Sequence, residues 1–203
     1  MPMAIHEKDL RASMVRYCEQ LWDRRLVSGT SGNVSVRLED GDVLATPAGR
    51  SLGRLLPGDI VRVDALGAPR DAAQRPTSEL PLHLAAYRAR PDAACLIHTH
   101  PTFCVVWSKC GTIFPQDTVG ARETLGPVAW TAFLPAGSAE LAALCAGEFA
   151  RGFDTVLMER HGLSTLGKTL EEAFVLTDLA EEAARIAYFS RLANVGSDDL
   201  TGF

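Results

Sequence analysis

The sequence lacks the features that would place it in a membrane or on a nucleic acid. No run within its 203 residues approaches the roughly 20 apolar residues that a membrane span requires. Lys and Arg together number 20 against 25 Asp and Glu, and the net charge of −5 excludes the basic surface typical of nucleic-acid binders. Residues 1–8 hold no apolar core of a signal peptide. We therefore expect a cytoplasmic protein with neither a nucleic-acid nor a membrane partner.

Cysteine is also scarce, and its pattern excludes two further classes of site. The five cysteines are odd in number and show no CxxC spacing, and several lie in apolar runs such as 94–97. This pattern predicts reduced core residues, and it argues against a structural zinc site built from cysteine. No GxGxxG motif follows a first strand, so the sequence does not predict a doubly wound dinucleotide-binding fold.

Strand and helix patterns interleave along the chain. A length of 203 residues with 47% hydrophobic content fits a single domain, residues 1–203, with a sizeable core. Apolar periodicity predicts helices over 6–27, 77–88, 101–109, 138–151 and 169–193, and strands over 34–38, 43–46, 60–63, 93–97, 128–131 and 155–158. Residues 39–42 predict a hairpin turn. We therefore expect an α/β fold with a mixed or mainly antiparallel sheet.

Three histidines stand where predicted strands end. Side chains at i and i+2 of an extended segment point to the same side, so His98 and His100 can reach one cation. His161 follows another predicted strand, residues 155–158, and precedes Gly162. Three histidines with an open fourth position are the ligand set of a catalytic zinc site. The alternative is that these are capping, loop or surface histidines without a ligand.

Glu79 lies at the start of a predicted helix, in the sequence Pro-Thr-Ser-Glu. Acidic residues are common there because they interact favourably with the helix dipole. The functional alternative is a carboxylate beside a metal ion that transfers a proton. His83, one helical turn later, is interpreted as a helix-surface or packing residue.

Three short segments rich in hydroxyls and glycine could offer hydroxyl and backbone N–H groups to an anion. Each could equally be an ordinary turn or helix cap. The segments are Thr30-Ser31-Gly32-Asn33, Thr46-Pro47-Ala48-Gly49 and Thr77-Ser78.

Five motifs, taken in their order along the chain, resemble those of the class II aldolase/adducin family and, within it, those of the short fuculose-1-phosphate aldolases. The resemblance runs from about residue 8 to residue 192, through residues 28–35, 46–49, 76–79, 98–100 and 160–162. It implies an α/β/α fold with a mainly antiparallel central sheet, and a homotetramer with fourfold symmetry. The implied substrate is a phosphorylated sugar, a ketose 1-phosphate similar to L-fuculose 1-phosphate, cleaved to dihydroxyacetone phosphate and an aldehyde.

The resemblance also implies roles for particular residues. Zinc, with cobalt or manganese as alternatives, would be held by His98, His100 and His161. Glu79 would be a further ligand in the resting state and the group that transfers the proton. The substrate phosphate would be bound by Gly32, Asn33, Thr46, Gly49, Thr77 and Ser78.

The sequence departs from this family in one segment. Bacterial fuculose-phosphate aldolases carry a tyrosine in the part matching residues 112–122 that protonates the aldehyde oxygen, and this chain has none there. By location alone, Asp117, Arg122 and Glu123 are the candidates for that role.

The same metal site serves other members of the family. Sugar-acid phosphate decarboxylases and methylthioribulose-phosphate dehydratases therefore remain alternatives, whereas the pentulose-phosphate 4-epimerases usually carry aspartate where Glu79 stands. A non-catalytic scaffold, as in adducin, is disfavoured because such proteins lose metal ligands that this chain retains.

Overall fold

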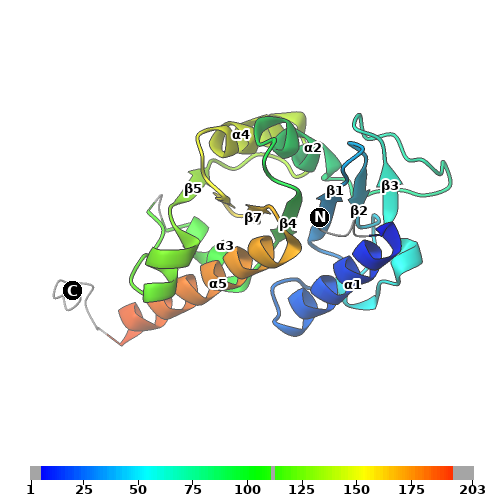
Figure 1. Cartoon of the computed structure of the whole chain (residues 1–203). Coiled ribbons are helices and arrows are strands. Elements are labelled where there is room, and N and C mark those ends of the chain that lie inside the picture. The colour runs from blue at the N-terminus through cyan, green and yellow to red at the C-terminus, as the bar shows by residue number, and fades with distance from the viewer. Residues whose placement is uncertain (1–5, 111–112, 194–203) are drawn as a thin grey trace.

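A seven-stranded sheet forms the centre of the computed structural model, which describes residues 6–110 and 113–193 (Figure 1). The strands are β1 (Asn33–Arg37), β2 (Val43–Ala45), β3 (Val61–Val63), β4 (Cys95–Thr99), β5 (Val128–Thr131), β6 (Thr155–Met158) and β7 (Gly162–Gly167). The α-helices are α1 (Glu7–Asp23), α2 (Leu80–Ala89), α3 (Thr102–Ser108), α4 (Ala139–Ala150) and α5 (Leu170–Leu192). Two short 3₁₀ turns, Leu52–Arg54 and Pro57–Asp59, and a π-helical turn, Ala121–Leu125, complete the described elements.

The strand order is β3-β2-β1-β4-β7-β6-β5, and every neighbouring pair except β5 and β6 is antiparallel. A parallel pair needs a crossover connection, and here α4 supplies it. The prediction of a mainly antiparallel sheet is confirmed.

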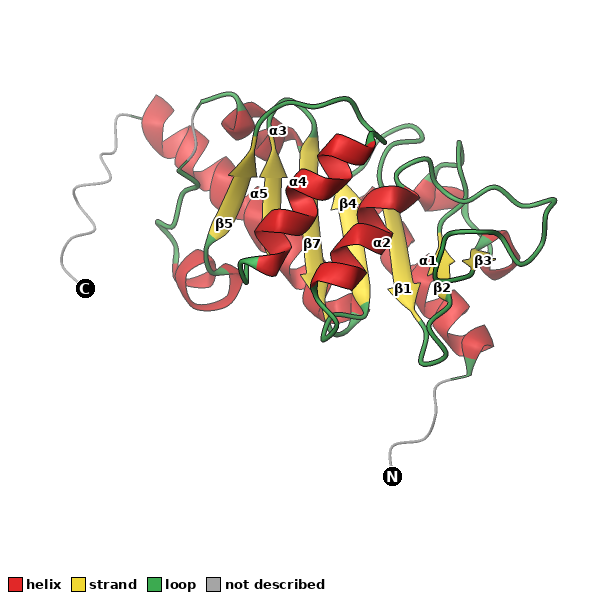
Figure 2. Ribbon diagram, turned by 90° about the horizontal axis from the view of Figure 1, so that it is seen from above, coloured by secondary structure: helices red, strands yellow, loops and turns green. Residues whose placement is uncertain are grey.

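Helices cover both faces of the sheet, as Figure 2 shows: α2 and α4 lie on one face, and α1 and α5 on the other. The side chains of β4 alternate between these layers. Leu96 packs in the cluster with α2 and α4, whereas Cys95 and Ile97 pack in the cluster with α1. The α/β/α arrangement is therefore also confirmed.

Each helix and strand predicted from the sequence is present, with ends shifted by a few residues. One central strand, β7, was not predicted. It is fully buried between β4 and β6, although it contains only two large apolar residues, Leu163 and Leu166. Glycine at both ends and Ser-Thr in the middle make the segment look like a loop in the sequence.

The glycine that ends β7 is required by close packing against the start of α5. A Cβ atom on Gly167 would lie 2.6 Å from the backbone nitrogen of Ala173 and 2.8 Å from the carbonyl oxygen of Thr169. These contacts are too short for any side chain, so the fold requires glycine at this position. The same glycine is one reason why the sequence did not predict a strand here.

The cysteine prediction holds for four of the five residues. Cys18, Cys95, Cys104 and Cys145 are buried, whereas Cys110 is exposed at the end of α3, and all five are unpaired. Within the described part of the chain, no helix has the length and apolar character needed to cross a membrane.

Candidate metal centre and active site

Four side chains predicted to form the site converge at one end of β4. Glu79, His98, His100 and His161 each offer one ligand atom, and these four atoms lie within 4.8 Å of one another. They come from three parts of the chain: the residue before α2, the end of β4, and the turn between β6 and β7. The fold therefore brings together residues that are up to 82 positions apart, from Glu79 to His161.

His98 lies inside β4, which extends to Thr99 instead of ending before the histidine as the sequence predicted. The His98 ring is fully buried, and its Nδ1 lies 3.1 Å from both the carbonyl oxygen of Leu163 and the Oγ of Ser164. A carbonyl oxygen can only accept, so Nδ1 carries a proton and the other nitrogen, Nε2, faces the cluster. A histidine metal ligand is commonly oriented by such a partner.

His161 lies in the tight turn between β6 and β7, not in irregular backbone as expected. Arg160, just before it, has a φ of 54°, in the left-handed region that few residues other than glycine adopt. The Arg160 backbone N–H donates to the Oγ of Ser108 at 2.9 Å, and the His161 N–H donates to the carbonyl oxygen of Met158 at 3.2 Å. The last residue of α3 thus fixes the turn that presents His161.

Glu79 is the N-cap residue of α2, which begins at Leu80, three residues later than the predicted helix. Its Oε2 lies 3.0 Å from His98 Nε2, and its Oε1 lies 3.3 Å from His161 Nε2. Burial acts to raise the pKa of Glu79, but the neighbouring His98, His161 and Asn33 outweigh it and hold the pKa well below its usual range. The carboxylate is therefore ionised at neutral pH.

The arrangement of the cluster fits a cation at its centre. With its Nδ1 hydrogen-bonded to Leu163, the His98 ring turns Nε2 toward Glu79 Oε2, 3.0 Å away, and toward His100 Nε2, 2.9 Å away. Burial, and then the neighbouring His98 and His161, lower the pKa of His100 to about 3, so its ring is neutral. Lone pairs and a carboxylate this close repel one another unless a proton or a metal ion lies between them.

Two buried atoms of the cluster lack a hydrogen-bond partner among the described residues: Glu79 Oε1 and His161 Nδ1. A buried carboxylate oxygen without a partner is costly, and coordination to a metal ion removes that cost. The four side chains therefore fit a divalent cation, with the histidine-rich ligand set that zinc favours.

Gly162 allows the two strands that carry the histidines to approach closely. A Cβ atom there would lie 2.3 Å from the carbonyl oxygen of Thr99 and 2.7 Å from the ring of His100. We expect Gly162→Ala to displace that ring, to weaken metal binding, and to destabilise the protein by about 1–3 kcal/mol through overpacking. Zinc titration and urea denaturation measure the two effects.

Gly147→Ala is the matched control, because a Cβ on Gly147 of α4 meets nothing within 4 Å. It should bind metal as the wild type does and be no less stable. Unchanged zinc affinity in Gly162→Ala would contradict the steric argument.

The segments predicted to bind phosphate lie side by side. The Thr77 N–H donates to the carbonyl oxygen of Thr46 at 3.0 Å, and Pro47 pairs with Pro76 in an isolated β-bridge. Gly49 and Ser78 are exposed, whereas Thr46 and Thr77 are buried. The Thr46 hydroxyl already accepts a hydrogen bond from the backbone of Val34 at 3.1 Å.

Gly32 and Asn33, from the first of the three segments predicted to bind phosphate, make close contacts with other parts of the protein. Gly32, with a φ of 79°, packs so tightly that a Cβ would lie 2.5 Å from Val27. The Asn33 side chain donates from Nδ2 to Glu79 Oε2 at 2.9 Å, so it contacts the candidate catalytic carboxylate directly. The sequence predicted Asn33 at the site but not this partner.

His83 is buried, so the packing interpretation is confirmed and the surface one is wrong. Its ring bonds to Asn33 and Ser35 on β1. His83 lies four residues after Glu79, about one helical turn. This spacing was the one signal in the sequence that the His83 ring lies near Glu79.

The three candidates for the aldehyde-side proton donor do not join the cluster. Asp117 precedes the π-helical turn that contains Arg122 and Glu123, and the Arg122 guanidinium donates to the carbonyl oxygen of Gln116 at 2.7 Å. Within the described part of the chain, no hydrogen bond or ion pair connects them to Glu79 or the histidines. Thr112, the first residue of the segment 112–122 in which these candidates lie, is outside the described residues.

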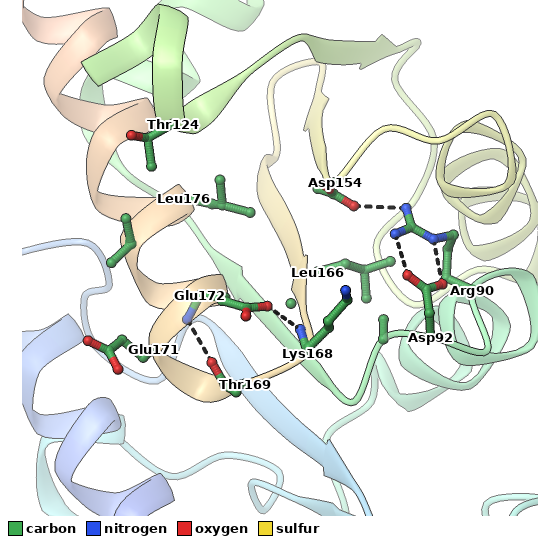
Figure 3. A pocket seen from close by; sticks show the side chains of 13 residues that line it. Arg90, Asp92, Thr124, Asp154, Leu166, Lys168, Thr169, Glu171, Glu172 and Leu176 are labelled. Carbon is green, nitrogen blue, oxygen red and sulfur yellow. Dashed lines mark hydrogen bonds and ion pairs between the residues drawn. The ribbon is translucent and has the colours of Figure 1, made fainter. Parts of the chain in front are cut away.

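A pocket of about 510 Å³ lies at the opposite end of β4 and β7 from the histidines, between Ala93, Gly167 and the start of α5. Figure 3 shows three of its charged side chains paired: Arg90 bonds to Asp92 and Asp154. The pocket is therefore separate from the candidate metal centre.

Comparison with known proteins gives the family. Residues 12–188 match the class II aldolase and adducin N-terminal domain. The L-fuculose phosphate aldolase of Methanococcus vannielii is 36% identical over 172 residues, which are 85% of this chain and 92% of that protein. The 3-oxo-tetronate 4-phosphate decarboxylase of Escherichia coli K12 is 29% identical over 187 residues, covering 90% of this chain and 87% of that protein.

A solved structure agrees with the sequence relatives. The crystal structure of L-fuculose-1-phosphate aldolase from Thermus thermophilus matches with a TM-score of 0.83 and 28% identity, over 91% of this chain and 95% of that one. This chain therefore belongs to the class II aldolase and adducin family. It is an enzyme of the lyase type with the class II aldolase fold, and class II aldolases use a divalent metal ion, in agreement with the cluster around His98.

Proposed function

We propose that this enzyme is a metal-dependent aldolase that reversibly cleaves a ketose 1-phosphate similar to L-fuculose 1-phosphate into dihydroxyacetone phosphate and an aldehyde. The observation that carries the proposal is the convergence of an ionised glutamate and three histidines within 4.8 Å. The names and identities of the archaeal relatives support this reaction over others of the family.

His98, His100 and His161 would hold zinc, with Glu79 as a further ligand, because imidazole nitrogens suit zinc better than magnesium or calcium. Cobalt or manganese could take its place. When bound, the metal ion supplies Lewis-acid stabilisation of the negative charge that develops on the substrate oxygen.

Glu79 would perform the proton transfer at carbon. Cleavage breaks the C3–C4 bond, leaves the electron pair on C3, and turns the C4 hydroxyl into an aldehyde as the ionised carboxylate of Glu79 takes up its proton. The carboxyl group of Glu79 then delivers a proton to C3. An ionised carboxylate in contact with histidines has the charge to take up such a proton and return it.

The phosphate would be bound by Gly32, Asn33, Thr46, Gly49, Thr77 and Ser78. The bridge between the segments of Thr46 and Thr77 supports this, because it holds two of the proposed segments side by side. From the family resemblance we further propose a single domain over residues 1–203, a homotetramer and a cytoplasmic location.

Decarboxylation of a sugar-acid phosphate is the second candidate, favoured by the decarboxylase relatives at 28–29% identity. Both reactions leave an electron pair on the carbon beside a carbonyl group, so the same metal centre could serve either.

The products distinguish the two candidates. Zinc-loaded enzyme should release dihydroxyacetone phosphate from L-fuculose 1-phosphate and should leave L-fuculose, which lacks the phosphate, uncleaved. A parallel assay should find no carbon dioxide released from a 3-oxo-tetronate 4-phosphate. Carbon dioxide release without dihydroxyacetone phosphate would overturn the aldolase proposal in favour of the decarboxylase.

A further inference from the structure

A continuous chain of buried hydrogen bonds leads from Glu79 into the protein interior. Asn33 Nδ2 donates to Glu79 Oε2 at 2.9 Å, and Asn33 Oδ1 lies 2.5 Å from His83 Nε2. His83 Nδ1 lies 2.6 Å from Ser35 Oγ, which lies 2.7 Å from the hydroxyl of Tyr87. His83 and Ser35 are fully buried, and Asn33 and Tyr87 are 4% exposed.

Asn33, His83, Ser35 and Tyr87 form a relay of hydrogen bonds that ends at the Glu79 carboxylate. The direction of each bond follows from that carboxylate. The Glu79 carboxylate can only accept, so Asn33 presents its amide nitrogen to it and its oxygen to His83. His83 must then carry its proton on Nε2, which leaves Nδ1 to accept from the hydroxyl of Ser35. Tyr87 in turn donates toward Ser35, whose carbonyl oxygen it also reaches at 2.9 Å.

The His83 ring is neutral, as this pattern requires. Burial, and then the nearby His98, lower the pKa of His83 to about 3. A neutral imidazole donates at one nitrogen and accepts at the other, so the ring can link Asn33 to Ser35 in one orientation only.

The relay leaves the two oxygens of Glu79 unequal. Oε2 accepts the bond from Asn33, whereas Oε1 has no hydrogen-bond partner among the described residues and lies 3.3 Å from His161 Nε2. Oε1 is therefore the oxygen available for a proton or for coordination. If the Asn33 amide were turned over, its oxygen would face the carboxylate and repel it.

We propose that His83 is a positioning residue for the reaction: by fixing the amide of Asn33 it holds the carboxylate of Glu79 with Oε1 as the reactive oxygen, and Ser35 and Tyr87 hold His83. This inference rests on the proposed role of Glu79. Among the described residues, the carboxylate of Glu79 has no other hydrogen bond or ion pair except those with the histidines of the cluster.

Replacement of His83 tests the relay. His83→Leu removes both bonds and should lower kcat by about 10- to 100-fold with little change in KM, as the loss of a residue that orients a metal-site side chain does. The visible absorption spectrum of the Co²⁺-substituted enzyme should change as well, because it reports the geometry of the ligands. His83→Gln, which offers one donor and one acceptor, should restore much of both.

Two further variants keep the test informative if His83→Leu does not fold. Asn33→Asp retains the bond to His83 but turns an oxygen toward Glu79, and should change the Co²⁺ spectrum and lower kcat. Tyr87→Phe removes the far end of the relay and should have a smaller effect. Tyr17→Phe, on α1 and away from the relay, is its matched control and should behave as the wild type.

A purely structural role for His83 predicts another result. In that case His83→Leu and Tyr87→Phe would lower the melting temperature while the Co²⁺ spectrum and kcat stayed at wild-type values, and the proposal would be overturned. The spectrum requires no substrate. If the wild type bound Co²⁺ but cleaved no ketose phosphate, the aldolase assignment would fail, and the spectral comparison would still decide whether the relay positions Glu79.

Discussion

Glu79→Gln is expected to reduce cleavage of the ketose phosphate by about 10²- to 10⁴-fold, the range that general acid–base catalysis contributes. Glutamine keeps the shape of the side chain and can still accept the hydrogen bond from Asn33. It carries no negative charge, however, and cannot take up or deliver the proton. The rate of dihydroxyacetone phosphate release, measured with the zinc content of each preparation, gives the size of the effect.

Glu148→Gln is the control, because Glu148 lies on α4 and its carboxylate pairs with Arg151 at the surface. It should leave the rate unchanged. Near wild-type cleavage by Glu79→Gln with zinc bound would exclude Glu79 as the proton-transfer group. Loss of zinc together with activity would show instead that Glu79 acts mainly as a ligand.

Removal of the metal, or of His98, should have an effect of similar size on activity and an additional effect on stability. A ligand that binds only the folded protein stabilises it by about 2.7 kcal/mol at 100 times its dissociation constant. We expect zinc to raise the melting temperature of the chelator-treated wild type and to restore activity. His98→Ala should show neither response, because its Nε2 is central to the cluster.

The measurement is the difference in melting temperature with and without zinc, which separates metal binding from the cost of the cavity that the alanine leaves. His6→Ala is the matched control, since His6 is exposed and lies before α1. An equal zinc-dependent shift in wild type and His98→Ala would refute the assignment of His98 as a ligand.

The sequence was sufficient to predict the members of the metal cluster but not how they are held. Alternation along a strand placed His98 and His100 together, the end of another predicted strand added His161, and the family motifs assigned Glu79 as a further ligand. The structure confirms that these four side chains meet. The contacts that orient them, such as Nδ1 of His98 with Leu163, depend on β7, whose glycines and hydroxyl residues resemble a loop.

The role of Asn33 could not be predicted because it depends on residues from two separate elements. Local sequence shows an asparagine after a glycine, a pattern typical of a turn. Only the folded protein brings the start of α2 to the start of β1, so that Asn33 reaches both Glu79 and His83. The fold class followed from apolar patterns, whereas the buried polar contacts required tertiary structure.

The pairing of strands around His98 limits where the length of this chain can change during evolution. His98 lies opposite Asn33 on β1 and opposite Ser164 on β7. Because side chains alternate along a strand, one residue inserted within β1, β4 or β7 would turn these partners to the other face of the sheet. An insertion in an exposed connection, such as residues 65–73, would leave that alignment intact. New substrate preferences in this lineage should therefore arise through changes in loop length, while the three strands keep a constant number of residues.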